Sequence, residues 1–139
     1  MVIDTSVLLH IAFREAGWQE SIRFLSRQPR LALSAVSFVE AHAVIRSSGR
    51  RGSEEGDPEE VVDALLATLE VEVVSFDAAQ AREARRAYSR YGKGQGHPAQ
   101  LNFGDVAVYA LAAHLGEVLA FVGEDFSRTD LTCVALPLL

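Results

Sequence analysis

The sequence predicts an α/β fold, a three-layer α/β/α sandwich around a central, mostly parallel sheet of about five strands. Five apolar segments, each too short for a helix, are spread along the chain. Most stretches between them have apolar residues at helical spacing, and a helix is the usual connection between parallel strands. The segment 118–122 is apolar throughout, as expected for a strand that is buried on both faces.

The strands and helices are expected in alternation along the chain. The expected strands are residues 2–3, 31–34, 71–75, 118–122 and 133–136. The expected helices are residues 6–14, 18–26, a segment around 38–44, a segment that starts at Pro58, 78–91 and 103–115. Expected helix caps are Thr5 and Ser6, then Asp57, Asp77 and Asn102. Residues 47–56 are rich in glycine, serine and arginine and are expected to form an exposed loop.

Size and composition indicate one domain spanning residues 1–139. Apolar residues make up 49% of the chain and charged residues 23%, which is ordinary for a soluble globular protein. We expect no membrane span and no signal peptide, because no apolar run approaches 20 residues and the first strand begins at residue 2. Cys133 is the only cysteine, so an intrachain disulfide is excluded and a cytoplasmic location is expected.

The formal net charge is −6, which counts against a nucleic-acid binder that relies on a broad basic surface. The charges are nevertheless grouped. Acidic residues gather between positions 54 and 60, beside a predicted helix start. Basic residues gather between positions 82 and 93, where Glu83 is the only acid. A local basic surface is therefore expected on the helix 78–91.

Four acidic residues lie where predicted strands pass into helices. They are Asp4, Glu40, Asp105 and Asp125. The carboxyl ends of parallel strands meet at one edge of a sheet, so these side chains are expected to converge there. Convergence of like charges is costly unless a divalent cation is bound between them. Asp77 also follows a strand, but the helix after it needs a cap.

The types of side chain available favour Mg²⁺, with Mn²⁺ as a possible substitute. The four carboxylates offer oxygen ligands, which magnesium prefers. The sequence has no cysteine pair and no paired histidines, which are the usual ligands of zinc. One or two such ions can orient an attacking water in phosphodiester hydrolysis. Asp4 and Asp105 are assigned as metal ligands, and Glu40 would complete the pocket. The fourth acid is left open among Glu124, Asp125 and Asp130, with Asp125 preferred.

Four segments, taken together and in order, resemble the PIN-domain nucleases, and most closely the VapC-type toxins of bacterial toxin–antitoxin pairs. They are residues 2–6, 34–44, 102–112 and 123–130. The resemblance implies a PIN-like fold and an endoribonuclease whose catalytic residues are Asp4, Glu40, Asp105 and Asp125. It also implies an antitoxin partner that covers the active site, and a homodimer.

A second set of residues is expected to contact the RNA substrate. The set is Ser6, Arg86, Arg90, Lys93 and His97. Ser6 could bind substrate or water near the acids, and His97 lies in a loop beside the basic helix. The basic segment as a whole, which also includes Arg82 and Arg85, could meet RNA phosphates or could form a solvated helix face. The remaining histidines, His10, His42 and His114, are expected to be structural.

Three other kinds of protein combine a small α/β fold with acidic residues. A phosphoaspartate receiver needs a lysine after its fifth strand, and the only lysine, Lys93, lies elsewhere. A haloacid-type phosphatase needs Asp-x-Asp after the first strand, and residue 6 is serine. A catalytically inactive PIN-fold module that binds RNA or protein is the stronger rival, although all four acids are retained.

Overall fold

A sheet of five parallel strands runs through the centre of the protein, whose computed structural model describes residues 1–48 and 57–138. The strands are β1 (Val2–Ile3), β2 (Leu31–Ser34), β3 (Val71–Val74), β4 (Leu119–Phe121) and β5 (Cys133–Ala135). Their order across the sheet is β3-β2-β1-β4-β5, and each neighbouring pair is parallel. The predicted sheet is confirmed, with β1 at its centre.

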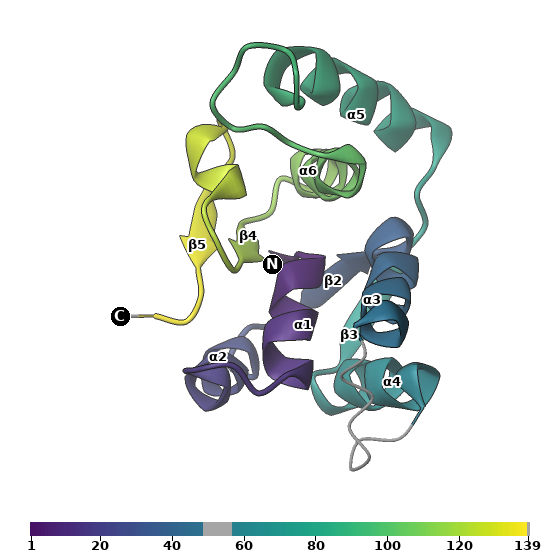
Figure 1. Cartoon of the computed structure of the whole chain (residues 1–139), viewed down its shortest axis with the longest axis vertical. Coiled ribbons are helices and arrows are strands. Elements are labelled where there is room, and N and C mark those ends of the chain that lie inside the picture. Colours follow the sequence, from purple (N-terminus) through teal and green to yellow (C-terminus); the bar gives the residue numbers. More distant parts are fainter. Residues whose placement is uncertain (49–56, 139) are drawn as a thin grey trace.

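The helices connect the strands on both faces of the sheet (Figure 1). In the described residues they are α1 (Thr5–Ala12), α2 (Trp18–Leu25), α3 (Ala35–Ser47), α4 (Pro58–Thr68), α5 (Ala78–Tyr91), α6 (Phe103–Leu115) and a short 3₁₀ helix, η1 (Asp125–Arg128). Helices α5 and α6 have the predicted bounds. Of the predicted loop 47–56, all but the first two residues lie outside the described residues. No described helix is long and apolar enough to cross a membrane.

Helix α1 begins and ends earlier than predicted. Its N-cap is Asp4, whose carboxylate accepts a hydrogen bond from the backbone N–H of Ser6 at 3.0 Å, so the expected cap at Thr5 and Ser6 is wrong. Aspartate caps as well as serine, because its short side chain reaches the free N–H groups of the first turn. The helix ends at Ala12, and Arg14 then adopts φ +51°, which is incompatible with a right-handed helix.

The sheet separates two apolar layers, because successive strand residues point to opposite faces. Val2 and Phe121 pack on the side of α5 and α6. Ile3, Leu33 and Ala120 pack on the other side, against α1 to α4. Figure 1 shows α5 and α6 together on one side and the first four helices on the other, so the three-layer architecture is confirmed.

The strand order reverses direction between β1 and β4. The chain passes from β1 to β2, which lies next to β1 on one side within the sheet. It later returns to β4, which lies next to β1 on the other side. In open α/β sheets, ligands bind outside the carboxyl ends of the strands at such a reversal. The residues that follow β1 and β4, beginning with Asp4 and Val122, therefore border the expected binding site.

Candidate active site

The four acids predicted from the sequence are held by four different elements. Asp4 follows β1 and caps α1, and Glu40 lies in α3, which follows β2 directly. Asp105 is in the first turn of α6, and Asp125 opens η1 after β4. Because β1, β2 and β4 are parallel neighbours, the elements that follow them start at one edge of the sheet. The prediction that Asp105 also follows a strand is wrong, because α6 follows α5 directly in the order of elements.

Asp4 is fixed by the residue two positions after it. The carboxylate is 7% exposed and accepts hydrogen bonds from the backbone N–H and the hydroxyl of Ser6, at 3.0 and 2.5 Å. The Ser6 hydroxyl in turn accepts a hydrogen bond from the backbone N–H of Val122 at 3.0 Å. Ser6 therefore ties the start of α1 to the end of β4, across the reversal of strand order.

Asp105 is fixed by a reciprocal pair of hydrogen bonds with Asn102. The backbone N–H of Asn102 donates to Asp105 Oδ2, and the backbone N–H of Asp105 donates to Asn102 Oδ1, both at 2.9 Å. The predicted cap at Asn102 is thus confirmed, and it is a complete capping box. Within the described residues, Oδ1 of Asp105 accepts no hydrogen bond and is left for another ligand.

Glu40 reaches α6 through the space that Gly104 leaves open. A Cβ atom on Gly104 would collide with Oε2 of Glu40, so the carboxylate lies directly against the backbone of α6. Gly104 immediately precedes Asp105. The contact therefore brings the carboxylate that follows β2 to the start of the helix that carries Asp105.

The four acids influence one another's pKa values. The pKa of Asp105 is raised to about 7, chiefly because burial disfavours its charged form. The negative charges that also raise it belong to Asp4, Asp125 and Glu40. Burial likewise raises the pKa of Asp4, and the charge of Glu40 adds to that effect against the hydrogen bonds from Ser6. The four carboxylates form one electrostatically coupled group, which we call the acidic cluster.

The contacts of Asp130 separate it from this cluster. Its carboxylate accepts a hydrogen bond from the Tyr109 hydroxyl at 2.5 Å and lies 3.5 Å from the guanidinium of Arg90. The Tyr109 hydrogen bond is the main reason that the pKa of Asp130 is lowered. Asp125, by contrast, acts on the pKa of Asp105. Of the three candidates for the fourth acid, Asp125 is the one whose charge acts on Asp105, and its role as the fourth acid stays a prediction.

Comparison with known proteins identifies the family. Residues 1–131 match the family model described as PIN domain. Ribonuclease VapC42 of Mycobacterium tuberculosis is 42% identical over 133 residues, covering 94% of this chain and 96% of the relative. Ribonuclease VapC of Mycolicibacterium smegmatis is 42% identical over 134 residues, covering 96% and 99%. The protein belongs to the VapC ribonuclease family of PIN domains.

Solved structures share the fold of this PIN domain. VapBC2 from Rickettsia felis, bound to a DNA fragment from its promoter, aligns with a TM-score of 0.73 and 15% identity over 96% of each chain. VapC20 of M. tuberculosis, described as a sarcin–ricin loop cleaving toxin, aligns with a TM-score of 0.70 and 18% identity over 94% of this chain and 95% of that one. At these identities the likeness concerns the fold alone.

Two of the predicted RNA-binding arginines of this PIN domain are engaged by acidic neighbours. Arg86 forms an exposed ion pair with Glu83. Arg90 pairs with Asp130, and its guanidinium lies 4.7 Å from the centre of the Tyr91 ring. Their role in binding RNA remains a prediction.

The loop after α5 holds the other two predicted RNA-binding residues. Lys93 is exposed. His97 Nδ1 accepts a hydrogen bond from the backbone N–H of Ala99 at 3.0 Å, and its ring meets the Tyr91 ring edge-on. These contacts fix the loop, and they leave the RNA contact of both residues as a prediction.

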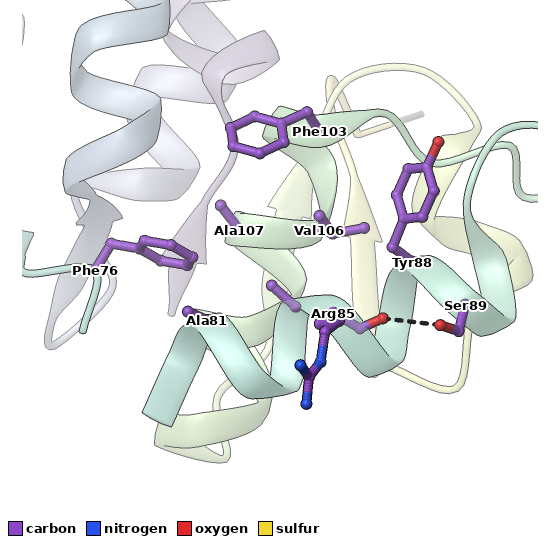
Figure 2. A pocket seen from close by; sticks show the side chains of 9 residues that line it. Phe76, Ala81, Arg85, Tyr88, Ser89, Phe103, Val106 and Ala107 are labelled. Atoms are coloured by element: carbon purple, nitrogen blue, oxygen red, sulfur yellow. Dashed lines mark hydrogen bonds between the residues drawn. The ribbon is translucent and has the colours of Figure 1, made fainter. Parts of the chain in front are cut away.

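A groove that the sequence did not indicate lies beside the start of α6 (Figure 2). Phe103 and Tyr88 line it, and Arg85 lies along its wall. Phe103 is 78% exposed, which is unusual for a phenylalanine. The available signal was an aromatic residue between the cap Asn102 and Gly104, in a turn whose inward positions are otherwise small.

The acidic cluster suits a hydrated, oxygen-preferring cation. Within the described residues, no group of three or more histidine, cysteine, aspartate and glutamate side chains is already arranged to hold a metal ion. Magnesium needs no such cage, because it keeps several waters and takes one or two carboxylates together with substrate phosphate. In the same helix starts, the hydroxyls of Thr5 and Ser37 are buried and lack a hydrogen-bond partner in the part of the chain described.

Proposed function

We propose that this protein is a metal-dependent endoribonuclease, the toxin of a toxin–antitoxin pair. The observation that carries the proposal is the acidic cluster at the reversal of strand order, where three neighbouring charges and burial raise the pKa of Asp105. A fold without catalytic use for these residues gains nothing from burying two carboxylates so close to two others. The retained cluster also argues against the inactive binding module.

The reaction we propose is hydrolysis of an RNA phosphodiester bond by water, which leaves a 5′-phosphate and a 3′-hydroxyl. Asp4 and Asp105 would hold Mg²⁺, or Mn²⁺ in its place, and Glu40 and Asp125 would complete the pocket directly or through water. When bound, the cation supplies a positive charge that orients the attacking water and offsets charge on the phosphate oxygens.

The residues around the acids prepare them for this task. The hydrogen bonds of Ser6 and Asn102 fix the directions of the Asp4 and Asp105 carboxylates before any ligand arrives. Preorganised carboxylates lose little freedom on binding, which favours both affinity and rate. The half-buried Glu40 and the exposed Asp125 leave the outer side of the cluster open to RNA.

Partners and location are part of the same proposal. Solved structures of similar fold include VapBC from Salmonella typhimurium, bound to DNA, and a toxin–antitoxin complex from Klebsiella pneumoniae. They support an antitoxin partner for this protein, and we propose that it covers the acidic cluster. We further propose that the protein is a homodimer and acts on RNA in the cytoplasm.

The decisive experiment removes one charge at a time. Asp4→Asn and Asp105→Asn should each lower cleavage of a structured RNA in Mg²⁺ by roughly 100-fold or more, because asparagine keeps the shape but not the charge of the ligand. EDTA should do the same to the unmodified protein. Asp77→Asn is the matched control, since Asp77 also follows a strand and caps a helix through Gln80 N–H. Equal activity of all three variants would overturn the proposal.

A further inference from the structure

The groove between α5 and the start of α6 has the size and lining of a small-molecule subsite. Its volume is about 390 Å³, within the range of sites that take ligand groups. The residues that line it and matter here are Phe76, Arg85, Tyr88, Phe103, Val106 and Ala107. Figure 2 shows the rings of Phe76, Tyr88 and Phe103 around the floor formed by Val106 and Ala107.

Two of the aromatic walls are held in place. The Tyr88 hydroxyl donates a hydrogen bond to the backbone carbonyl of Lys93 at 3.2 Å, and Gly92 packs directly against the Tyr88 ring. Phe103 is the first residue of α6, whose start is fixed by the capping box between Asn102 and Asp105. Its 78% exposure leaves most of the ring surface free. The Tyr88 ring and the backbone that carries Phe103 are therefore fixed, while the Phe103 ring itself is open to solvent.

The groove adjoins the acidic cluster through covalent geometry. Phe103 and Asp105 belong to the same first turn, two positions apart, and Gly104 between them contacts Glu40. The groove and the acidic cluster therefore share the start of α6 but lie on different sides of its first turn, because side chains two positions apart in a helix do not face each other. An RNA strand that passes over this helix start can meet both sides.

The chemistry of the lining fits an aromatic, flat occupant with a phosphate attached. Three rings offer π-faces, and Arg85 lies at the edge of the groove. Its exposed guanidinium points away from the rings in Figure 2 and forms no ion pair with any described residue. Stacking is available to every base and adds affinity that does not depend on salt. A protein with net charge −6 needs such contacts, because its overall field repels RNA.

We propose that this groove binds one unstacked nucleobase of the RNA substrate, next to the phosphate that is cleaved, with Phe103 as the stacking platform. The proposal rests on the proposed ribonuclease function and adds the subsite that selects or positions the nucleotide. An apolar side chain of a partner protein is the competing occupant. It would need apolar area but neither a π-face nor the cation of Arg85.

The test compares three replacements of Phe103 with the unmodified protein and with Leu138→Ala, which truncates an exposed apolar residue elsewhere. The binding probe is a single-stranded oligoribonucleotide that carries 2-aminopurine at one position in turn, measured in EDTA so that no cleavage occurs. The second readout is kcat/KM in Mg²⁺ on the same oligonucleotide, with or without an abasic site at the responsive position.

Phe103→Ala and Phe103→Leu should each weaken binding and kcat/KM about 5- to 150-fold, which corresponds to the loss of one stacked base. Phe103→Trp should keep both, and Leu138→Ala should change neither. With the unmodified protein, the abasic site should lower kcat/KM by the same factor as the Phe103→Ala substitution does. With the Phe103→Ala variant, the abasic site should lower kcat/KM no further.

The outcomes separate this proposal from the proposed function. If Phe103→Leu behaves like the unmodified protein, or if the abasic site acts equally on both, the groove is not a base subsite even though cleavage persists. If only inhibition by a co-expressed antitoxin is lost in Phe103→Ala, the groove is a protein-docking site and the proposal is overturned. If the 2-aminopurine signal depends on Phe103 while no variant cleaves RNA, the base subsite stands and the nuclease proposal fails.

Discussion

At the scale of single residues, Gly104 permits the contact between Glu40 and α6. Gly104→Ala would place a methyl group where Oε2 of Glu40 now lies, and the flexible glutamate is the partner that gives way. We expect activity to fall roughly 10- to 100-fold, since a displacement of about 1 Å is costly in an active site. Stability should rise by up to about 1 kcal/mol, because alanine favours a helix over glycine.

A double-mutant cycle checks whether Gly104→Ala acts through Glu40. In a Glu40→Gln background, Gly104→Ala should lower RNA cleavage no further, because the group it displaces has already lost its charge. Unfolding in urea and initial rates of cleavage are the two measurements. Additive losses of activity would mean that the methyl group disturbs Asp105 or the helix rather than Glu40.

Ser6 is a positioning residue by its contacts. Ser6→Ala removes the hydrogen bond to Asp4 and leaves the backbone N–H of Val122 without its partner. We expect a loss of about 1–3 kcal/mol in the free energy of unfolding, and a lower kcat from a misdirected Asp4 carboxylate. The matched control is Ser26→Ala, an exposed helix-end serine that should cost less than about 0.5 kcal/mol. Wild-type stability in Ser6→Ala would show that the bridge contributes nothing.

At the scale of elements, helix α5 presents two different outer faces. Arg85 and Tyr88 lie on the face that borders Phe103 and the groove. Arg86 lies on the face that borders His114, at the far end of α6 from the acidic cluster. The basic segment of the sequence is therefore divided by the helix into a side that adjoins the site and a side that does not.

This division distinguishes Arg85 from Arg86, which the sequence treats alike as possible RNA contacts. Arg85→Gln should weaken RNA binding and reduce the slope of log K against log salt by about 1, the effect of one lost phosphate contact. Arg86→Gln, the matched control one residue away, should have a smaller effect because Glu83 already neutralises it. A fluorescence titration at several salt concentrations measures both. Equal losses would return the basic segment to the role predicted from the sequence, with Arg86 among the phosphate contacts.

The sequence predicted the bounds and inward positions of the helices better than it predicted what their outward residues border. The inward positions of α5, such as Ala84 and Ala87, follow from helical periodicity alone. The outward choice between Arg85 and Arg86 depends on how α5 crosses α6, which no local pattern encodes. The cap of α1 was missed for a similar reason: Asp4, Thr5 and Ser6 are all good caps, and the backbone of β1 decides among them.

At the scale of the whole molecule, the parallel sheet explains why the acids could be found from sequence. Asp4 directly follows β1, and Glu40 lies early in the helix that follows β2, so both were expected at the same edge of the sheet without detailed geometry. The strand order was not predictable, because periodicity does not tell on which side of β1 each later strand adds. The choice of Asp125 over Asp130 likewise depended on Tyr109, a partner 21 residues away in the chain.

The raised pKa of Asp105 makes the stability of the metal-free protein depend on pH. Its folded pKa is about 7 and its ordinary value is 3.8, so the folded state holds the extra proton between these values. The free energy of unfolding should therefore fall as pH rises from 5 to 7.5, by up to about 2.5 kcal/mol of the roughly 4 kcal/mol that corresponds to the full shift. Urea unfolding in EDTA measures it. Asp105→Asn should show a smaller fall, and an identical pH profile would mean that Asp105 does not titrate in this window.

Divalent cation should reverse the cost of the acidic cluster. Mg²⁺ binds the folded state, and at 100 times its Kd it would add about 2.7 kcal/mol of stability.

Removing one of the mutually repelling charges should raise the melting temperature in EDTA and reduce the increase that Mg²⁺ produces. At pH 7.5, Asp105→Asn should melt at a higher temperature than the unmodified protein in EDTA, because repulsion and the burial of a charge are relieved. It should gain less from millimolar Mg²⁺, because a ligand has been lost. Asparagine retains the oxygen that accepts the Asn102 N–H, so the helix start is preserved in the comparison. A variant that melts lower in EDTA and gains as much from Mg²⁺ would show that Asp105 serves the helix start alone.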